Sequence, residues 1–324
     1  MATDALTADA RAIAAAVDIG GTKIAIGLVD PVGQVLARSQ TPTRADEGFE
    51  AAMERVSTVL AHISAEAGVR PSGIGIGCTG PVDPGSGAIG QVEFLPGWQD
   101  CNPVAWLSHR FGLPVAMEND AAAAALAESR CGTGRGKHSV IAVTVGTGIG
   151  AGLVVDGVLY RGVDGAHPEL GHHVVDASGP LCSCGATGCW EALASGPAIA
   201  ARYAAVAAPA GTYRPHLSAR EICDLARAGH APAMAEVRRT ATYLGLGIAN
   251  LVSLFIPDVI ALSGSVMNSA DLFLPTISDI IRRNCSLVPW QRVSVGPSML
   301  GSDAPLIGAG IVWHHRQQRP LRER

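Results

Sequence analysis

The pattern of apolar and polar positions along the chain predicts alternating strands and helices. Short apolar runs that end in polar or glycine-rich turns predict buried strands, and apolar residues spaced three and four apart predict amphipathic helices. The predicted strands cover residues 14–19, 24–29, 34–40, 74–78, 114–117, 139–145, 152–155 and 259–262. The predicted helices cover residues 49–67, 104–111, 121–129, 196–206, 218–228, 231–255 and 306–315. This alternation is typical of an α/β protein.

One arrangement occurs twice: a strand, a glycine-rich turn and then another strand. It is found near residue 20 and again near residue 147. A turn between two strands predicts a hairpin, whereas the dinucleotide-binding fingerprint leads from its glycines into a helix. The second turn, residues 146–150, also lacks the Gly-Lys-Ser/Thr ending of a P-loop. The repetition predicts two similar halves rather than one Rossmann unit.

Length and composition limit the class of protein. A chain of 324 residues favours two domains, and 48% hydrophobic with 16% charged residues excludes intrinsic disorder. The net charge of −4 gives no general nucleic-acid footprint, so we expect no nucleic-acid partner. No apolar run is long enough for a membrane helix, and the first residues do not form a signal peptide. We therefore expect a cytoplasmic protein with no membrane partner.

The two glycine turns have the chemistry of phosphate-binding loops. In the first, the glycines of Asp18-Ile-Gly-Gly-Thr-Lys23 let backbone N–H groups approach phosphate oxygens. Thr22 adds a hydroxyl and Lys23 a positive charge, while Asp18 can hold hydrated Mg²⁺ beside the phosphates. The alternative is an ordinary hairpin turn, and for one loop alone the two interpretations weigh equally. Two such loops in one chain favour a nucleoside triphosphate.

The run Glu118-Asn119-Asp120 comes directly before a predicted helix. In one interpretation Asn119 or Asp120 is simply the N-cap, a position that both residue types favour. In the other, Asp120 is the base for a hydroxyl nucleophile and Asn119 orients the substrate, because phosphoryl transfer needs one such carboxylate and careful positioning. The run by itself favours the cap.

Four soft metal ligands lie close together in the sequence: His172, Cys182, Cys184 and Cys189. Three thiolates and one imidazole are a common structural zinc set. The alternatives are a Cys182–Cys189 disulfide, which a reducing cytosol disfavours, and a catalytic cysteine, for which no paired base is apparent. The type and number of ligands favour zinc.

Residues beside this zinc set could serve the metal or a substrate. His173 follows His172, and if this stretch is a strand their side chains point to opposite faces, so that only one reaches the metal. Glu169 and Glu191 flank the set at its two ends. They are either surface charges or acceptors of hydrogen bonds from a polyol, on a loop that zinc holds in place.

Together these motifs resemble the ROK family of sugar kinases and sugar-responsive repressors, from about residue 14 to residue 311. The runs that carry the resemblance are Asp18–Lys23, Gly80–Asp83, Glu118–Asp120, Val145–Gly150, Glu169–His172 and Cys182–Glu191. The resemblance implies an actin/Hsp70/hexokinase-like (ribonuclease H-like) ATPase fold, with two α/β domains and a cleft between them. It implies a smaller domain of residues 12–118 plus about 308–324, and a larger one of residues 119–307 that carries the zinc loop.

The resemblance also implies a role for each matching position. Asp120 matches the catalytic base, and the zinc ligands match His172, Cys182, Cys184 and Cys189. The positions that match substrate-contacting residues are Gly80, Asn119, Asp120, Glu169, His172 and Glu191. The positions that match the nucleotide loops are Asp18, Gly20, Gly21, Thr22, Lys23, Gly146, Thr147, Gly148 and Gly264. The implied cofactors are ATP, Mg²⁺ and structural Zn²⁺, and a homodimer or higher homo-oligomer is implied as well.

Two stretches depart from the family pattern. Family members often have Gly-Gly-Gly in the adenosine loop, where this chain has Ser263-Gly264-Ser265. This departure bears on nucleotide affinity more than on nucleotide binding, because serine can still form a turn. Bacterial glucokinases of the family often have Pro-Asn-Leu-Pro-Gly-Trp, where this chain has Glu93-Phe94-Leu-Pro-Gly-Trp98. The missing asparagine weakens the case for glucose specifically.

The leading hypothesis is an ATP-dependent hexose kinase that converts glucose to glucose 6-phosphate, with Asp120 as general base. Among kinases, N-acetylmannosamine, N-acetylglucosamine and fructose are the alternative substrates. A second hypothesis is a sugar-sensing transcription repressor of the same family without its DNA-binding domain. Two features argue against a repressor: only 17 residues precede Asp18, too few for a helix-turn-helix domain, and the phosphate loops, which repressors often lose, are intact. A third is a catalytically inactive homologue, against which the intact Asn119-Asp120 pair argues.

Overall fold

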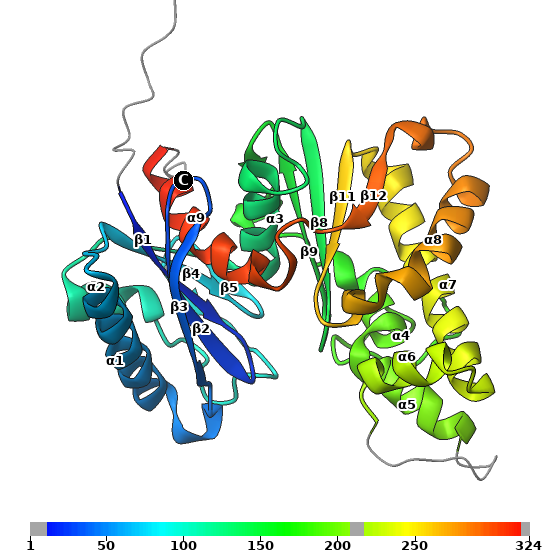
Figure 1. Ribbon diagram of the computed structural model, residues 1–324, viewed down its shortest axis with the longest axis horizontal. Helices are drawn as coiled ribbons and strands as arrows, with labels where there is room; N and C mark the ends of the chain where they lie inside the picture. Colours follow the sequence, from blue (N-terminus) through cyan, green and yellow to red (C-terminus); the bar gives the residue numbers. More distant parts are fainter. Residues whose placement is uncertain (1–11, 208–216, 319–324) are drawn as a thin grey trace, which may run out of the picture. The chain divides into compact units, whose positions relative to one another are not determined.

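The computed structural model describes residues 12–207 and 217–318, which divide by their contacts into two compact units (Figure 1). The first unit contains the chain up to Gly136, the segment Gly157–His167 and the C-terminal part from Asp303. The second contains Lys137–Asp156 and Pro168–Ser302. Residues 319–324, which the sequence analysis assigns to the smaller domain, lie outside the described residues.

The first unit is built on a five-stranded sheet in the order β3-β2-β1-β4-β7. Its strands are β1 (Ala14–Ile19), β2 (Lys23–Val29), β3 (Val35–Pro42), β4 (Gly73–Cys78) and β7 (Val115–Asn119). β2 is antiparallel to β1 and to β3, whereas β4 is parallel to β1 and to β7. A separate small hairpin is formed by β5 (Val82–Asp83) and β6 (Ala88–Ile89).

Helices cover both faces of this first sheet. They are α1 (Phe49–Ala67), α2 (Pro103–Phe111), α3 (Asp120–Cys131) and α9 (Ala304–Gln318). α1 and α2 share a core with Ala15 and Val17 of β1, whereas α9 packs on the intervening Ala16. Successive strand residues point to opposite faces, so α9 covers the face opposite α1. α3 lies against α9 so closely that a Cβ at Gly308 would be 2.6 Å from the carbonyl carbon of Ala123.

The second unit repeats the strand order of the first. Its sheet has the order β10-β9-β8-β11-β12, so a first strand again lies between its hairpin partner and a parallel strand. The strands are β8 (Ser139–Val145), β9 (Ile149–Val155), β10 (Val158–Leu159), β11 (Val259–Ser263) and β12 (Ser294–Pro297). The prediction of two similar halves, each with a glycine hairpin at its first two strands, is confirmed.

Five helices pack together in the described part of the second unit. They are α4 (Trp190–Ala194), α5 (Gly196–Ala207), α6 (Ala219–Arg227), α7 (Ala231–Phe255) and α8 (Ala270–Asn284). They share one apolar core with β8, β9 and β11. The short helix α4 docks through the buried Trp190, whose ring would be 2.1 Å from a Cβ at Gly247 of α7. A glycine at this point lets the indole lie flat on the helix backbone, which fixes α4 against α7.

The periodicity of the sequence predicts most elements to within a few residues. The helices 49–67 and 231–255 and the strands 14–19 and 139–145 have the predicted bounds. The helices and strands that the periodicity missed are α4, α8, β5, β6, β10 and β12. Pro275 lies inside α8 and interrupts its helical pattern, and β12 is short and contains Gly296.

The division into units differs from the expected boundary near residue 118. α3 lies in the first unit, because Ala123 packs against Gly308 of α9, whereas the sequence analysis assigned it to the larger domain. The segment Gly157–His167 also belongs to the first unit. Among the described residues, no helix combines the length and apolar character needed to cross a membrane.

Candidate active site

The turn between β1 and β2 forms the first candidate phosphate loop. The N–H of Gly20 donates to the carbonyl of Lys23 at 3.1 Å and closes the turn. Thr22 and Lys23 are exposed, so a hydroxyl and an ammonium group face the solvent here. A Cβ at Gly21 would lie 2.5 Å from the Cβ of Phe94, which leaves room only for glycine. The chain around Phe94 therefore packs directly on the phosphate loop.

Two carboxylates come together at the end of β1. Burial and the negative charge of Asp120 raise the pKa of Asp18 to about 7, although Lys23 acts in the opposite direction. Burial, Asp120 and Asp18 also raise the pKa of the Cys78 thiol well above its ordinary range. A divalent cation would relieve the repulsion between the carboxylates, and oxygen ligands are those that Mg²⁺ prefers. The Asp18–Asp120 pair therefore fits a hydrated Mg²⁺.

Asn119 and Asp120 lie where β7 ends and α3 begins. Asn119 is the N-cap: its Oδ1 accepts the N–H of Ala121 at 3.0 Å and that of Ala122 at 3.2 Å. Asp120 is the first residue of the helix, and its Oδ1 accepts the Ala121 N–H at 2.7 Å. Of the two capping candidates in the sequence, the structure selects Asn119. Capping therefore does not account for the carboxylate of Asp120.

The loop that follows β4 is tied to this capping residue. Nδ2 of Asn119 donates to the carbonyl of Gly80 at 3.2 Å. Gly80 has a φ of 83°, and a Cβ there would lie 2.3 Å from a methyl group of Val92. Only glycine fits both conditions. Two predicted substrate-contacting residues, Gly80 and Asn119, are thus in direct contact within the first unit.

A buried ion-pair cluster that the sequence analysis did not predict lies beside these residues. Glu118 is 4% exposed and accepts hydrogen bonds from Arg161 and from Arg316, the latter at 2.9 Å. Its carboxylate joins the end of β7 to the segment 157–167 and to α9. The available signal was an acidic residue in a strand that is otherwise apolar, which requires a cationic partner when buried.

The turn between β8 and β9 forms the second candidate phosphate loop. The N–H of Gly146 donates to the carbonyl of Gly148 at 2.9 Å, and the N–H of Gly196 donates to the carbonyl of Gly146 at 2.8 Å. Thr147, at the tip of the turn, is exposed. The first residue of α5 is thus hydrogen-bonded to the backbone of the turn and holds it in place.

The predicted adenosine loop lies behind the same turn. Gly264 has a φ of 94°, and a Cβ there would lie 2.4 Å from the carbonyl oxygen of Val145. The neighbouring Ser263 belongs to the regular strand β11, and Ser265 has right-handed helical dihedral angles. Only the central position of Ser263-Gly264-Ser265 therefore requires glycine, and the two serines leave the shape of the turn intact.

Glu191 connects the second phosphate loop to the zinc set. Its Oε2 accepts the N–H of Ile149, the first residue of β9, at 2.8 Å. A Cβ at Gly148 would lie 2.4 Å from the same oxygen. The other oxygen, Oε1, lies 3.9 Å from Nε2 of His172. One carboxylate thus faces both the backbone of the loop and a predicted metal ligand.

Glu169 stands at the start of a short turn, Leu170–His172, that packs on the same strand. Its carbonyl accepts the N–H of His172 at 3.0 Å. A Cβ at Gly171 would lie 1.7 Å from the carbonyl oxygen of Ile149, so the turn rests on the backbone of β9. Glu169 itself is exposed, which leaves its carboxylate accessible to a ligand.

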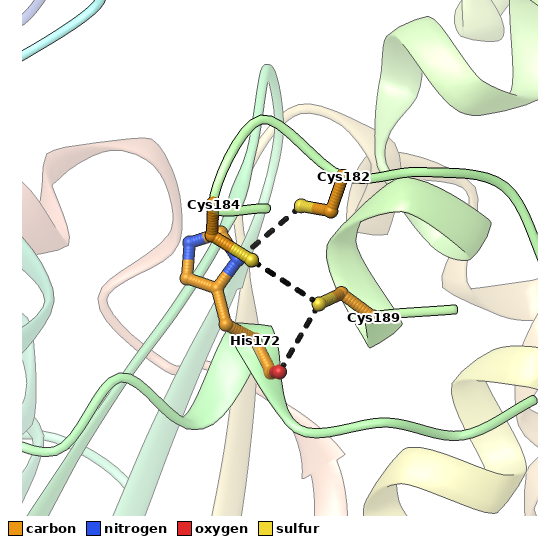
Figure 2. A group of neighbouring side chains, drawn as sticks. All are labelled: His172, Cys182, Cys184 and Cys189. Atoms are coloured by element: carbon orange, nitrogen blue, oxygen red, sulfur yellow. Dashed lines mark hydrogen bonds between the residues drawn. The ribbon is translucent and has the colours of Figure 1, made fainter. Parts of the chain in front are cut away.

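The four predicted metal ligands converge on one point, as Figure 2 shows. One ligand atom from each of His172, Cys182, Cys184 and Cys189 lies within 4.8 Å of the others. Nδ1 of His172 is 3.5 Å from Sγ of Cys182, and the sulfurs of Cys184 and Cys189 are 3.4 Å apart. All three cysteines are free thiols, and the sulfur distance exceeds the roughly 2.05 Å of a disulfide.

These separations match a tetrahedral zinc site. Zn–S bonds of about 2.3 Å and Zn–N bonds of about 2.0 Å place tetrahedral ligands about 3.5–3.8 Å apart. The two distances above are within a few tenths of an ångström of those values. His172 then uses Nδ1 toward the metal and Nε2 toward Glu191, an arrangement common for zinc-bound histidines.

His173 is not part of the metal cluster. Its Nδ1 contacts the carbonyl of Leu170, and its ring lies 5.3 Å from that of Trp190. The prediction that only one of the two histidines joins the cysteines agrees with this arrangement. The reason differs from the one proposed, because His172 ends a short 3₁₀ turn and is not in a strand.

The predicted site residues divide between the two units. Those in the first unit are Asp18, Gly20, Gly21, Thr22, Lys23, Gly80, Asn119 and Asp120. Those in the second unit are Gly146, Thr147, Gly148, Glu169, His172, Cys182, Cys184, Cys189, Glu191 and Gly264. Within each unit the structure places a glycine hairpin beside carboxylates: Asp18 and Asp120 at the first, and Glu191 at the second.

Known proteins are similar to this chain in sequence over most of its length. The model of the ROK family matches residues 14–316. The glucokinase of Streptomyces coelicolor is 35% identical over 308 residues, covering 90% of this chain and 95% of the relative. Xylose repressors of Bacillus also match, but this chain covers only 61% of their length.

Two solved structures extend the likeness to three dimensions. The ROK hexokinase of Thermus thermophilus is 37% identical with a TM-score of 0.80, and the comparison covers 93% of this chain and 97% of that one. A ROK glucokinase of Streptomyces griseus in complex with glucose and AMPPNP is 33% identical with a TM-score of 0.81, covering 92% and 98%. The fold is therefore the two-domain actin/hexokinase-like α/β fold, and the chain belongs to the ROK family as a sugar kinase.

Proposed function

We propose that this kinase transfers the γ-phosphoryl group of ATP to a hexose, with the 6-hydroxyl of glucose as the main acceptor. The observation that carries the proposal is the pair of carboxylates, Asp18 and Asp120, which the paired strands β1, β4 and β7 bring to the same end of the sheet beside a glycine hairpin. The relatives named as glucokinases support this choice of reaction, as does the relative whose structure holds glucose and AMPPNP.

The phosphates of ATP are proposed to bind at the glycine turns. Backbone N–H groups of such turns suit phosphate oxygens, and Lys23 adds a positive charge at the first turn. Asp18 would hold hydrated Mg²⁺, which neutralises phosphate charge when bound and offsets the repulsion between Asp18 and Asp120. Gly264 would lie beside the nucleoside, as the family resemblance implies.

Asp120 is the proposed general base. Its carboxylate accepts the proton of the sugar hydroxyl while the hydroxyl oxygen forms a bond to the γ-phosphorus. The bond from that phosphorus to the bridging oxygen of ADP breaks in the same step, and Asp120 later releases the proton to water. Positioning and charge neutralisation supply most of the catalysis in reactions of this kind.

The sugar is proposed to contact polar groups at the positions that the family resemblance implies. Those positions are Gly80, Asn119 and the acceptors Glu169, His172 and Glu191, whose polar groups are suited to ring hydroxyls. Zinc at His172, Cys182, Cys184 and Cys189 would fix the loop that carries these acceptors. His172 would then serve both the metal and the sugar.

The identity of the sugar depends in part on Phe94. It replaces the asparagine usual in glucokinases of the family, and it is 42% exposed. An apolar side chain there tolerates the methyl of an N-acetyl group, and apolar contacts discriminate small groups by only about 1–3 kcal/mol. We therefore expect glucose to be phosphorylated with weaker discrimination than in a dedicated glucokinase.

The test is an assay of ADP release at fixed MgATP with glucose, mannose, fructose, N-acetylglucosamine and N-acetylmannosamine. The highest kcat/KM is expected for glucose, with measurable activity on the N-acetyl sugars. If an N-acetyl sugar or fructose exceeds glucose by about a hundredfold, the choice of glucose is wrong and only the kinase class survives. If no hexose is phosphorylated, the proposed reaction is wrong.

We also propose that the protein forms a homodimer or a larger homo-oligomer, on the strength of the family resemblance alone. Size-exclusion chromatography with light scattering measures this directly. A mass close to 33.2 kDa at micromolar concentration would contradict it.

A further inference from the structure

Thr43 is completely buried and lies directly behind the first phosphate loop. It follows β3, whose last residue, Pro42, pairs with Lys23 of β2. Thr43 therefore continues the pairing of β3 with β2 by one residue past the end of the sheet. This places it opposite Thr22, in the loop between β1 and β2. The proposed reaction assigns no role to this residue.

Thr43 binds two carbonyl groups of the loop. Its hydroxyl donates to the carbonyl of Gly20 at 2.6 Å, and its backbone N–H donates to the carbonyl of Thr22 at 3.0 Å. Both carbonyls are thereby drawn toward the interior of the unit. In the described part of the chain, no protein acceptor forms a hydrogen bond with the N–H groups of Gly21 or Thr22. The loop thus keeps donors available for an anion while its acceptors are occupied.

Arg55 of α1 holds Thr43 in turn. Its Nη2 donates to the carbonyl of Thr43 at 2.7 Å, and its Nη1 donates to Glu47 at 2.6 Å. The guanidinium is partly buried, with 24% of the side chain exposed. A charged donor on a rigid helix makes a strong and directional bond to the carbonyl. The chain of contacts runs from α1 through Thr43 to the phosphate loop.

We propose that Thr43 is a positioning residue for the phosphoryl donor, with Arg55 as its support. By binding the carbonyls of Gly20 and Thr22, Thr43 orients the N–H groups of the loop toward the phosphates. This inference rests on the proposed function, because it takes the loop to be the one that binds ATP. Thr43 touches no reacting atom, so its loss affects the nucleotide and not the chemistry at Asp120.

The experiment compares Thr43→Val, which keeps the shape of the side chain but loses the hydroxyl, with Thr43→Ser, which keeps the hydroxyl. In Thr43→Val the KM for MgATP should rise about tenfold and the KM for glucose should stay within about twofold of wild type. Thr43→Ser should restore most of the loss. Equal increases in both KM values, or a Thr43→Ser variant as impaired as Thr43→Val, would overturn the inference.

Thr58→Val is the matched control for the lost hydroxyl. The Thr58 hydroxyl donates to the carbonyl of Glu54 at 3.0 Å on the exposed face of α1, away from the loop. Both KM values should stay at the wild-type level in this variant. A rise in the KM for MgATP equal to that of Thr43→Val would mean that the effect is not specific to the loop and would overturn the inference.

Arg55→Met keeps the inference testable if Thr43→Val folds poorly. The loss of the bond to the Thr43 carbonyl should raise the KM for MgATP about threefold, with little effect on glucose. Arg44→Met is its control, because the Arg44 side chain contacts the same Glu47 at 3.2 Å in an exposed ion pair. Equal effects of the two substitutions would overturn the inference.

Direct binding separates this inference from the proposed function. Titration calorimetry with MgAMPPNP measures nucleotide affinity without turnover, and hydrogen exchange reports on the amides of residues 20–23. If wild type phosphorylates no hexose, the proposed function fails, yet weaker MgAMPPNP binding and faster exchange in Thr43→Val still support the inference. Unchanged affinity in Thr43→Val, or no nucleotide binding by wild type, overturns it.

Discussion

The two glycine hairpins share a backbone design but are held in place by different chemistry. In the first unit the uncharged Thr43 binds the carbonyls of the turn. In the second unit the carboxylate of Glu191 binds the amide of Ile149, directly after the turn. The first turn lies beside Asp18 and Asp120, whereas the carboxylate that holds the second also faces His172 of the metal cluster.

This comparison indicates that the chemistry of each turn comes from residues outside its hairpin. The first turn has two acidic neighbours, Asp18 and Asp120, whose mutual repulsion favours binding of a cation. A bound cation would neutralise phosphate charge during phosphoryl transfer. The second is linked through Glu191 to the predicted sugar contacts and to the metal ligands, so a change at the metal should reach this turn and not the first.

Asp120→Asn should give the largest effect and should act only through the first unit. The amide removes the proposed base, so kcat should fall by about 10²–10⁴-fold. Asn119 makes the helix cap and an asparagine Oδ1 can still accept the Ala121 N–H, so stability and sugar affinity should change little. The measurements are steady-state kinetics, glucose binding by calorimetry and thermal unfolding.

Asp303→Asn is the control for Asp120→Asn. It removes a carboxylate from an exposed ion pair with Arg38 and should leave kcat unchanged. Turnover of Asp120→Asn within a few-fold of wild type would show that Asp120 is not the base. A large loss of stability with normal turnover in the folded fraction would assign it a structural role instead.

Cys184→Ser should act through the second unit. It removes one of four ligands, so we expect zinc content well below one ion per chain and glucose affinity reduced by about 10–100-fold. The KM for MgATP should change less, because the first hairpin, with Lys23 and Asp18, belongs to the other unit. Elemental analysis of protein purified without chelators, together with glucose titration, measures both effects.

Cys101→Ser is the control for this substitution, because Cys101 is a free thiol outside the cluster. It should leave both zinc content and glucose affinity unchanged. Wild-type protein without zinc would disprove the metal site. A full complement of zinc in Cys184→Ser would show that the thiolate of Cys184 is not a ligand.

Sequence patterns predicted the features that depend on neighbouring residues. The hairpins follow from apolar runs broken by glycine, and the zinc set follows from cysteines spaced a few residues apart. The ion pairs of Glu118 with Arg161 and Arg316 could not be predicted in this way, because 43 and 198 residues separate the partners. No local pattern determines which distant cation reaches a buried acid.

The contacts by which Thr43 and Glu191 hold the two turns could not be predicted either, because they too join residues that are distant in the sequence. Thr43 contacts Gly20 only because β3 pairs with β2 in one particular register. Glu191 reaches Ile149 only because α4 docks on α7 through Trp190 and Gly247. The sequence marked Glu191 as a candidate through its place beside the cysteines, but its bond to the second phosphate loop depends on the packing of helices.

Gly148→Ala tests whether the second turn and the sugar contacts are linked through Glu191. The added Cβ would lie 2.4 Å from Oε2 of Glu191 and must displace the carboxylate from the Ile149 amide. The KM values for glucose and for MgATP should then both rise, by about tenfold, since a misplaced group loses binding at both sites it serves. Gly296→Ala is the control, because a Cβ there meets no atom within 4 Å. An increase in the KM for MgATP alone would show that Glu191 does not couple the second turn to the sugar contacts.

The last expected effect concerns stability and leaves substrate binding aside: it is the pH dependence that arises from Asp18. The fold raises the pKa of this carboxyl from 3.8 to about 7, so between these values the folded chain holds a proton that the unfolded chain has lost. The contribution of this proton to the free energy of unfolding is therefore fully present below pH 3.8. It is lost as the pH rises toward 7, which lowers the free energy of unfolding by an amount on the order of 1–4 kcal/mol. Asp18→Asn cannot titrate, so its stability relative to wild type should increase from pH 5 to about pH 7 and then level off by pH 8, in urea unfolding without Mg²⁺ or nucleotide.

Asp271→Asn provides the contrast that makes this test decisive. The ion pair with Arg227 lowers the pKa of Asp271, so its contribution is present above the unfolded pKa and is lost only in acid. Its difference from wild type should therefore be constant between pH 5 and pH 8. If Asp18→Asn behaves in the same constant way, the repulsion between Asp18 and Asp120 is too weak to favour a cation, and the proposed magnesium site at the first hairpin loses its physical basis.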